Sequence, residues 1–520
     1  MLTRFKATIL TVALTLSLSA IKPVFAEPPA TGPSAPEAPP AQHPSPTSSG
    51  SEHPSDKTEN ALPPASTTSH ELALPGRALR FKAIAGAVRL NDAATLAPRA
   101  DIATLAFLLD GADAAKRPVT FAINGGPGAA SAWLNLGGIG PWRLRLDEKG
   151  PSPSQPPIAV ENAETWLDFT DLVFIDPPGT GYSRILASGE ETRRHFYSVG
   201  GDIDALAVTI RKWLTQNHRL ESPKFLVGES YGGFRGPKLA RRLQDEEGIG
   251  VQGLVLISPV LDFGWFEGAN NPLTFAARLP SQAAAARGVS GPNGRAALTD
   301  VEAYAAGPYL ADLLRGERDP QALERMADKV AALVGLDPSL VRKLGGRIDP
   351  ATFARERGRA KEKVTSLYDA EISGFDPFPH AASSDYSDPL LDAVKAPLAS
   401  AMADLTSNRF NWPVETRYEI LNESVNHAWN FGSGRERPEA LSDLKKAMAL
   451  DSTMRVLVAH GITDQVTPYF ASQLLLDQVP PMGDANRLRL KVYGGGHMLY
   501  FDDKSRAALR EDARKLVAGK

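Results

Sequence analysis

A serine flanked by glycine residues occupies positions 228–233 of the 520-residue chain, which read Gly-Glu-Ser-Tyr-Gly-Gly. The spacing G-x-S-x-G is typical of a nucleophile elbow, a sharp turn from a strand into a helix that presents a serine hydroxyl. Because the turn strains the backbone, it needs small residues two positions before and after the serine, and glycine meets that need. The pattern alone is weak, since ordinary glycine-rich turns also match it. Ser230 is therefore a candidate nucleophile that needs partners.

An acid and a histidine follow Ser230 along the chain, each shortly after an apolar run. Asp464 comes after the run 455–459, and His497 comes after the run 488–493. Serine, acid and histidine in this order, at the ends of strands, is the arrangement of the catalytic triad in α/β-hydrolases. In such a triad His497 would take the proton of the Ser230 hydroxyl, and Asp464 would orient the imidazole and stabilise its charged form.

Other residues compete for two of these positions. His460 ends the core strand that precedes Asp464, but it comes before the acid, and we interpret it as a structural histidine. Asp451 and Asp484 also lie near strand ends. Asp464 is preferred to both because of the place where its strand stops.

The apolar runs between these residues predict the elements that hold them. Four short and continuous runs are 119–123, 171–175, 225–227 and 254–257. Such runs are typical of parallel strands that are buried on both faces. Helical periodicity, from about residue 202 to 218 and from 233 to 245, lies between them. The order predicts a mainly parallel sheet covered by helices on both faces, with Ser230 at a carboxyl end of the sheet.

The rest of the folded chain is predicted to form one edge of the sheet and an inserted cap. Runs at 79–84, 87–90 and 104–109 predict antiparallel strands at one edge of the sheet. Residues 262–451 have helical periodicity with frequent Gly and Pro breaks, which indicates a helical cap. We therefore expect an α/β-hydrolase fold, with a catalytic domain formed by residues 71–261 and 452–520 and a cap formed by 262–451.

The N-terminal region indicates export. Residues 1–26 combine Arg4 and Lys6 with a short apolar core and small residues before Glu27, which is typical of a secretory signal peptide. Residues 27–70 are rich in Pro, Ser and Ala, which predicts a disordered linker. No second run of membrane length follows, so no membrane span is expected in the mature protein. The predicted location is the periplasm or the exterior of the cell.

Composition argues against several classes of partner. The chain contains no cysteine, and its net charge is only −3, with basic residues spread along the sequence. Nucleic acid is therefore not an expected partner. There is no H-E-x-x-H pattern and no strand followed by G-x-G-x-x-G, so neither a metal nor a cofactor is expected. The sequence makes no prediction of oligomeric state.

Four motifs together resemble the serine carboxypeptidase family. They are Asn-Gly-Gly-Pro-Gly at 124–128, Asp-Pro-Pro-Gly-Thr-Gly-Tyr-Ser at 176–183, the elbow at 228–233 and Gly-His-Met at 496–498. Their order and spacing fit an exported, bacterial-type member from about residue 80 to the end. Glu229 beside the serine distinguishes this pattern from proline iminopeptidases. The resemblance implies that Asn124 and Glu229 hold the C-terminal carboxylate of a substrate, and that the backbone N–H groups of Gly126 and Tyr231 form the oxyanion hole.

The sequence also departs from the family pattern. Many members carry Glu in an E-x-G-P turn where this chain has Gly138, Trp where it has Ala122, and Cys where it has Ala129. The missing Glu removes one expected contact to Asn124 and Glu229.

These observations predict a serine carboxypeptidase that removes C-terminal residues from peptides through an acyl-enzyme. Since Glu229 and a substrate carboxylate cannot both stay charged in a water-poor pocket, we expect activity to be favoured at acidic pH. An esterase or acyltransferase on the same triad is the alternative within enzymes. A non-catalytic binding protein with this fold is the alternative from another class.

Overall fold

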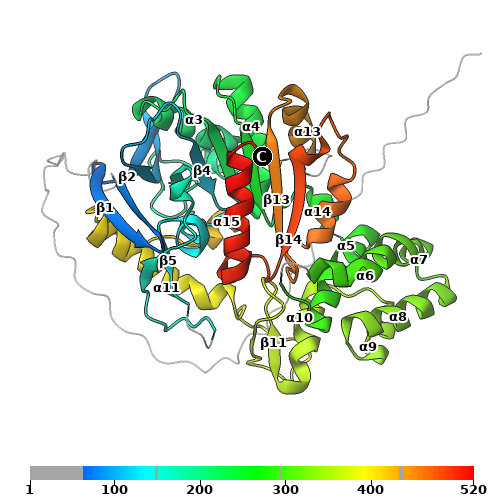
Figure 1. Cartoon of the computed structure of the whole chain (residues 1–520). Helices are drawn as coiled ribbons and strands as arrows, with labels where there is room; N and C mark the ends of the chain where they lie inside the picture. Colours follow the sequence, from blue (N-terminus) through cyan, green and yellow to red (C-terminus); the bar gives the residue numbers. More distant parts are fainter. Residues whose placement is uncertain (1–61, 147–149, 267, 292–293, 433–437) are drawn as a thin grey trace, which may run out of the picture. The chain divides into compact units, whose positions relative to one another are not determined.

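The described part of the chain in the computed structural model comprises residues 62–146, 150–266, 268–291, 294–432 and 438–520 (Figure 1). These residues belong to one compact unit, Thr58–Lys520. The predicted signal peptide and the predicted linker up to residue 61 lie outside the described residues.

A ten-stranded sheet forms the centre of this unit, in the order β1-β2-β3-β7-β4-β9-β10-β13-β14, with β8 beside β3. The strands, including two separate two-stranded sheets, are β1 (Ser66–Leu74), β2 (Arg77–Asn91), β3 (Pro98–Leu109), β4 (Val119–Ile123), β5 (Trp142–Leu144), β6 (Ala159–Glu161), β7 (Asp171–Ile175), β8 (Arg184–Ile185), β9 (Lys224–Glu229), β10 (Gly253–Ile257), β11 (Lys363–Thr365), β12 (Ser373–Phe375), β13 (Arg455–Gly461) and β14 (Leu488–Tyr493). The neighbours from β7 to β14 pair in parallel, whereas β1, β2 and β3 pair antiparallel and form one edge. The predicted mainly parallel sheet with an antiparallel edge is confirmed.

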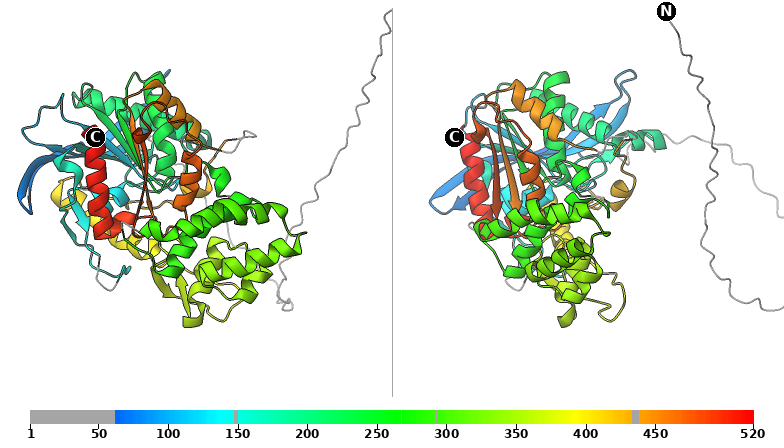
Figure 2. Two further views of the ribbon diagram at one scale, coloured as in Figure 1. Left: turned by 45° about the vertical axis from the view of Figure 1, so that its right-hand side comes forward. Right: turned by 90° about the vertical axis from the view of Figure 1, so that its right-hand side faces the viewer.

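Helices cover both faces of the sheet (Figure 2). The α-helices are α1 (Ala132–Leu134), α2 (Glu190–Phe196), α3 (Val199–Gln216), α4 (Tyr231–Glu246), α5 (Pro272–Arg287), α6 (Thr299–Tyr304), α7 (Leu310–Arg315), α8 (Pro320–Val334), α9 (Pro338–Lys343), α10 (Pro350–Gly358), α11 (Leu391–Asp404), α12 (Glu423–His427), α13 (Leu441–Leu450), α14 (Tyr469–Leu476) and α15 (Asp503–Val517). In the right-hand view of Figure 2, α15 lies on one side of the sheet and α13 on the other.

Successive residues of the central strands enter two different cores. Val227 of β9 and Val255 of β10 pack in the core that contains Leu509 of α15 and residues of α11. Their neighbours Leu226 and Leu256 pack in the core beneath α3, α4 and α13. Because side chains alternate along a strand and both faces are covered, the interior positions of these strands are apolar. This explains the continuous apolar runs in the sequence, and the result is an α/β-hydrolase fold.

The structure corrects the end of the predicted linker. β1 begins at Ser66, inside the stretch 27–70 that was expected to be disordered, and pairs with β2 along its whole length. Only Leu72 and Leu74 of this edge strand are buried, and its other side chains are partly or fully exposed. An edge strand that is held mainly by backbone hydrogen bonds needs few apolar residues, so its composition resembles that of a linker.

The structure also corrects the extent of the predicted cap, 262–451. The helices α5 to α10 share a hydrophobic cluster, which also includes Tyr469 and Phe470 of α14, and stand together at the lower right of Figure 1. In contrast, Val394 and Leu398 of α11 pack in the core beside α15, and Leu444 of α13 packs in the core beside α4. Helical periodicity identifies these helices but does not reveal which surface each of them covers.

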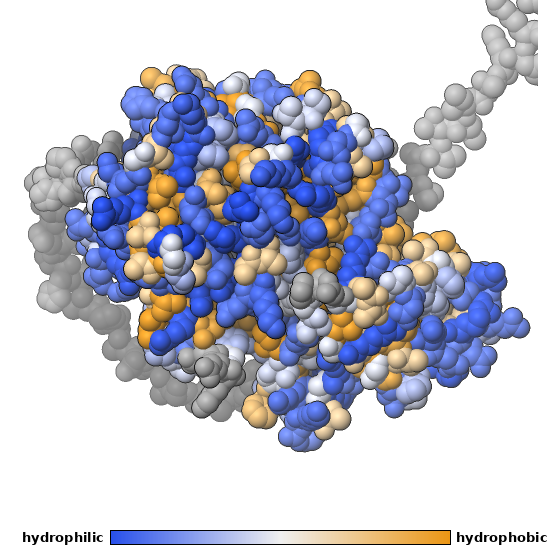
Figure 3. Space-filling view, in the orientation of Figure 1, coloured by the Kyte–Doolittle hydropathy of each residue, from blue (hydrophilic) through white to orange (hydrophobic). Residues whose placement is uncertain are grey.

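The surface that faces the viewer in Figure 1 is mainly hydrophilic over its centre, with smaller hydrophobic areas between (Figure 3). Among the described residues, no helix combines the length and the apolar character that crossing a bilayer requires.

Candidate active site

The turn from β9 into α4 has the geometry of a nucleophile elbow. Ser230 adopts φ 59° and ψ −120°, a conformation that is strained for a residue with a side chain. A Cβ atom at Gly228 would overlap the carbonyl oxygen of Gly232, and one at Gly232 would overlap the carbonyl oxygen of Ile123. Glycine is therefore required at both positions by close packing of the backbone. Ser230 itself is partly exposed at the start of the helix.

The turn 124–128, which follows β4, lies directly against this elbow. A Cβ atom at Gly125 would come within 2.5 Å of the backbone nitrogen of Tyr231. Tyr231 is the first residue of α4, so no carbonyl of its own helix accepts its N–H. This N–H and the glycine turn therefore lie side by side next to Ser230.

A buried arginine fixes the orientation of the glycine turn. Arg235 of α4 donates to the carbonyl oxygens of Asn124 and, at 3.3 Å, of Gly125. In a planar trans peptide the C=O of one residue and the N–H of the next point in opposite directions. Since the Gly125 carbonyl faces Arg235, the Gly126 N–H faces away from Arg235.

Asp202 of α3 holds Arg235 in place. Its carboxylate accepts from Arg235 Nε at 2.6 Å and from Nη2 at 3.2 Å, and both side chains are 1% exposed. The guanidinium also lies 4.7 Å from the centre of the Tyr231 ring. The pair thus joins α3, α4 and the turn after β4 in one buried unit beneath the elbow.

His497 and Asp464 form a buried pair at the ends of β14 and β13. Nδ1 of His497 lies 2.8 Å from Oδ2 of Asp464, and the side chains are 3% and 0% exposed. Burial lowers the pKa of His497, but the charge of Asp464 and its hydrogen bond outweigh burial, so the pKa lies above its ordinary value. Burial raises the pKa of Asp464, but His497 and the donors around it outweigh burial and hold the pKa below its ordinary value. The pair therefore favours a proton on Nδ1, which leaves Nε2 to accept another.

Both Ser230 and His497 are attached to the end of β10. The Ser230 N–H donates to the carbonyl oxygen of Ile257 at 2.9 Å. The hydroxyl of the next residue, Ser258, donates to the carbonyl oxygen of His497 at 2.7 Å. The sheet thereby brings together the serine and the histidine, which are separated by more than half of the folded chain.

A segment between α10 and α11 packs against the histidine loop. The His497 N–H donates to the carbonyl oxygen of Tyr368 at 2.5 Å, and the two rings meet edge to face with centroids 5.3 Å apart. A Cβ atom at Gly496 would overlap the Tyr368 carbonyl oxygen. This close approach explains why a glycine precedes the histidine.

Glu229, the last residue of β9, is a buried acid beside Ser230. Its Oε2 accepts from Asn124 Nδ2 at 2.7 Å and from the hydroxyl of Tyr500 at 2.6 Å. Burial raises the pKa of Glu229 above its ordinary value, although the charge of His497 and the two donors act in the opposite direction. Glu229 therefore holds a proton to higher pH than a free carboxyl group does.

Tyr500 lies over the position where the family pattern has Glu. A Cβ atom at Gly137 would lie 2.6 Å from Tyr500 Cε2, and one at Gly138 would lie 3.0 Å from Tyr500 Cγ. The ring is fully buried. The space above the two glycine residues is thus filled by an aromatic side chain from the segment that follows His497.

The motif at 176–183 links the chain after the glycine turn to a segment before α12. The buried Asp176 accepts from the Ser131 N–H at 2.9 Å, the Tyr182 N–H at 3.3 Å and the Tyr418 hydroxyl at 3.0 Å. Burial raises the pKa of Asp176 to about 6. Its contacts position the chain after the glycine turn.

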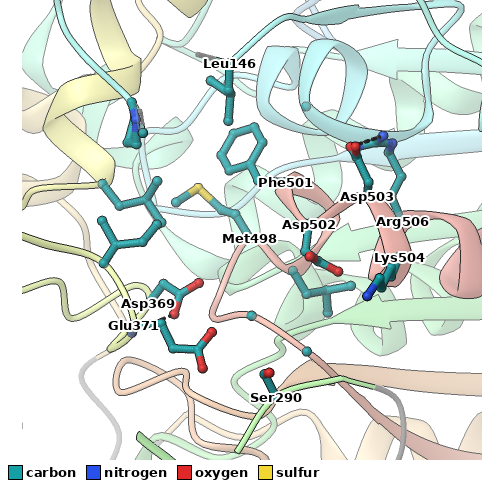
Figure 4. Close-up of a pocket in the computed structure, with 18 of the residues that line it drawn as sticks. Leu146, Ser290, Asp369, Glu371, Met498, Phe501, Asp502, Asp503, Lys504 and Arg506 are labelled. Carbon is teal, nitrogen blue, oxygen red and sulfur yellow. Dashed lines mark hydrogen bonds and ion pairs between the residues drawn. The ribbon is translucent and has the colours of Figure 1, made fainter. Parts of the chain in front are cut away.

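A cavity of about 620 Å³ lies beside the segment that follows β14 (Figure 4). Met498 and Phe501 form an apolar part of its wall, and Asp369, Glu371 and Asp502 form an acidic part. The lining includes neither His497 nor Tyr500, whose side chains are buried against Asp464 and Glu229.

The structure brings together all seven residues that the sequence singled out: Asn124, Gly126, Glu229, Ser230, Tyr231, Asp464 and His497. The rival His460 is buried, and its Nε2 lies 2.8 Å from the hydroxyl of Ser472. Asp451 and Asp484 bond to residues of their own turns. Sequence reasoning missed Asp202, Arg235 and Tyr500. Arg235 lies five residues after Ser230 on the predicted helix, but nothing in the sequence indicates its partners.

Comparison with known proteins agrees with the sequence motifs. Residues 107–264 match the model of the family described as serine carboxypeptidase. Serine carboxypeptidase-like 45 of Arabidopsis thaliana is 28% identical over 155 residues, which is 28% of this chain and 31% of that protein. The pheromone-processing carboxypeptidase KEX1 of Yarrowia lipolytica is 29% identical over 157 residues, 30% of this chain and 23% of that protein. A carboxypeptidase Y homolog of Arthroderma benhamiae is 30% identical over 149 residues, 28% of this chain and 27% of that protein. The matches therefore span less than a third of each relative.

Solved structures resemble the chain only distantly. A proline iminopeptidase of Mycobacterium smegmatis has a TM-score of 0.34 and 14% identity, with 87% of this chain and 99% of that chain covered. A juvenile hormone epoxide hydrolase of the silkworm Bombyx mori has a TM-score of 0.36 and 13% identity, with 84% and 78% covered. Residues 107–264, about 30% of the chain, are similar to the serine carboxypeptidase family.

Proposed function

We propose that the protein is a serine carboxypeptidase, which hydrolyses the last peptide bond of a peptide that has a free C-terminus. The observation that carries the proposal is the position of Glu229, a buried acid with a raised pKa directly before Ser230. In such a substrate the terminal carboxylate lies one residue beyond the reacting carbonyl, and one residue spans about 3.8 Å. Ser230 and Glu229, which are adjacent in the chain, can therefore contact the reacting carbonyl and the terminal carboxylate, respectively.

In the proposed first step, Ser230 Oγ attacks the carbonyl carbon of the last peptide bond while His497 Nε2 takes the hydroxyl proton. The N–H groups of Gly126 and Tyr231 stabilise the oxyanion that forms. Asp464 holds the imidazole and stabilises its positive charge. The imidazolium then gives its proton to the leaving amine, the C–N bond breaks, and the C-terminal residue departs.

The second step releases the acyl group from Ser230. Water gives a proton to His497 and attacks the ester carbonyl, and the Ser230 oxygen leaves with the proton returned from the imidazolium. An alcohol in place of water would give an ester, so acyl transfer uses the same residues.

To bind the carboxylate of a substrate, the side chain of Glu229 must carry a proton. Two carboxylates in contact in a dry site cannot both remain charged, so the pair shares one proton. As pH rises, this proton is lost and binding weakens. His497 acts in the opposite direction, because its pKa is raised and only its neutral form can accept the serine proton. We infer that the pH optimum for hydrolysis of free acids is lower than the pH optimum for hydrolysis of esters.

The experiment that tests the proposal compares three N-blocked dipeptides: the free acid, its C-terminal amide and its methyl ester, from pH 4 to 9. The free acid should be cleaved with the highest kcat/KM at low pH, the amide should be refused, and Ser230→Ala should abolish turnover. Equal turnover of acid and amide, or turnover of the ester alone, would move the protein to the esterase or acyltransferase class. Absence of labelling by a fluorophosphonate probe would favour a non-catalytic binding protein.

We also propose that the protein acts outside the cytoplasm, on peptides in the periplasm or the exterior of the cell. The support is the signal-peptide pattern of residues 1–26. N-terminal sequencing of the mature protein from the producing cell should find a start close to Glu27, and an intact Met1 would contradict export by cleavage.

A further inference from the structure

Tyr500 is buried with its hydroxyl directed at the candidate carboxylate site. It follows His497 by three residues, on the single 3₁₀ turn Leu499–Phe501. Its side chain is fully buried, and its hydroxyl lies 2.6 Å from Oε2 of Glu229. A buried phenol hydroxyl requires a partner, and here the partner is an ionisable acid beside the nucleophile.

The glycine pair 137–138 makes room for this ring. The ring packs so closely over Gly137 and Gly138 that an added methyl group at either position would press on its carbon atoms, at 2.6 and 3.0 Å. A longer side chain at position 138 would occupy the space that Tyr500 fills. Gly138 and Tyr500 therefore form a matched pair in this chain, and the hydroxyl of Tyr500 supplies a hydrogen bond to Glu229.

Both donors of the site bind the same oxygen of Glu229. Asn124 Nδ2 and the Tyr500 hydroxyl donate to Oε2, at 2.7 and 2.6 Å. An oxygen that already accepts two hydrogen bonds is a poor carrier for the proton of a carboxylic acid. The proton of the neutral Glu229 therefore belongs on Oε1, where it can be donated.

We propose that Tyr500 is the positioning residue for substrate recognition: together with Asn124 it fixes Oε2 of Glu229, so that Oε1 and its proton meet the C-terminal carboxylate of a peptide. This role rests on the proposed carboxypeptidase function and deepens it. Tyr500 touches Glu229 and acts through it.

The surroundings of Glu229 determine how the role can be detected. The titratable groups that act on Glu229 are Tyr500 itself, His497 after β14 and Asp464 after β13. The Tyr500 hydroxyl lowers the pKa of Glu229, whereas burial raises it. Removing the hydroxyl should therefore raise that pKa further and move the high-pH decline of free-acid activity to higher pH.

The test compares Tyr500→Phe with the native protein on the free acid and the methyl ester of one N-blocked dipeptide, from pH 4 to 9. The ratio of kcat/KM for the acid to that for the ester should fall about tenfold to hundredfold, mainly through KM, because the lost hydrogen bond served a charged or proton-sharing group. The pH at which hydrolysis of the free acid declines should become higher.

Tyr493→Phe is a matched control, since Tyr493 donates to Asp512 at 2.8 Å from a similarly buried site away from Glu229. It should change neither the ratio nor the pH profile. If Tyr500→Phe does not fold, Gly138→Ala is the second variant, because its methyl group would displace the ring and should lower the same ratio.

The outcomes separate the two proposals. A native protein that does not prefer the free acid refutes the carboxypeptidase function and, with it, the role of Tyr500. A native protein that prefers the acid, with Tyr500→Phe unchanged in ratio and pH profile, refutes only the role of Tyr500. An equal loss of kcat/KM on the free acid and on the ester in Tyr500→Phe would show that Tyr500 supports the fold and not substrate recognition.

Discussion

Asp464→Asn should remove most of the activity while leaving the fold intact. Oδ1 of Asp464 accepts from the N–H groups of Val466 at 2.8 Å and Thr467 at 3.0 Å. An asparagine would keep its oxygen on these two donors, which directs its NH₂ group toward His497 Nδ1. The imidazole would then have to accept at Nδ1 and carry its proton on Nε2. In that tautomer His497 cannot take the proton of Ser230.

The magnitude follows from the distance between the two charges. When His497 becomes positive in the transition state, its Nδ1 lies 2.8 Å from the Asp464 carboxylate. At an effective dielectric constant of about 20, two unit charges at this distance attract by about 6 kcal/mol, which corresponds to about 10⁴ in rate. The neutral hydrogen bond already present in the ground state reduces the gain. We therefore expect kcat to fall by about 10³- to 10⁴-fold.

The assay is steady-state hydrolysis of the N-blocked dipeptide ester, which does not depend on carboxylate recognition. Asp484→Asn is the control, because Asp484 is an exposed acid at a strand end that bonds only to its own turn, and it should keep native kcat within about twofold. A loss of less than about tenfold for Asp464→Asn, in a protein with native circular dichroism, would refute the assignment of Asp464 as the acid of the triad.

Three further predictions concern recognition and the buried framework. Because burial raises the pKa of Glu229, kcat/KM for the free acid should fall as pH rises through that pKa, and Glu229→Gln should abolish this fall; identical pH profiles for the two proteins would contradict it. Asp202→Asn should cost about 3–5 kcal/mol in urea denaturation, since it leaves Arg235 charged and buried, and a loss below about 1 kcal/mol would show that Arg235 finds another partner. Gly228→Ala should lower stability by about 3 kcal/mol or more, because its methyl group would overlap the backbone of Gly232, and a native melting temperature would show that the elbow can relax.

The sequence predicted the central strands well for a physical reason. β4 and β7 have the bounds expected from their apolar runs. Strands covered on both faces tolerate no polar interruption, so their limits are visible in the composition. β1 lacks this constraint, because it lies at an edge, and its Ser, Thr and His residues resemble those of an unfolded segment.

The residues of the candidate site that lie in short sequence motifs could be predicted from the sequence. Ser230 and the glycine turn are recognisable because steric needs within a few residues determine the residue types around them, and Glu229 was recognised through the resemblance to the serine carboxypeptidase family. Tyr500 was missed because its contact with Glu229 joins residues 271 positions apart and depends on the missing side chain at Gly138. The pair of Asp202 and Arg235 was missed for the same kind of reason, since it depends on how α3 packs against α4.

The most direct test of the central claim is a time course by mass spectrometry on a ten-residue peptide and its C-terminally amidated twin, at about pH 5 and with Ser230→Ala in parallel. We predict successive loss of single residues from the C-terminus of the free acid, no change in the amidated twin, and no loss with Ser230→Ala. Cleavage inside the peptide, equal trimming of the amidated twin, or trimming that persists in Ser230→Ala would contradict a serine carboxypeptidase that recognises the terminal carboxylate.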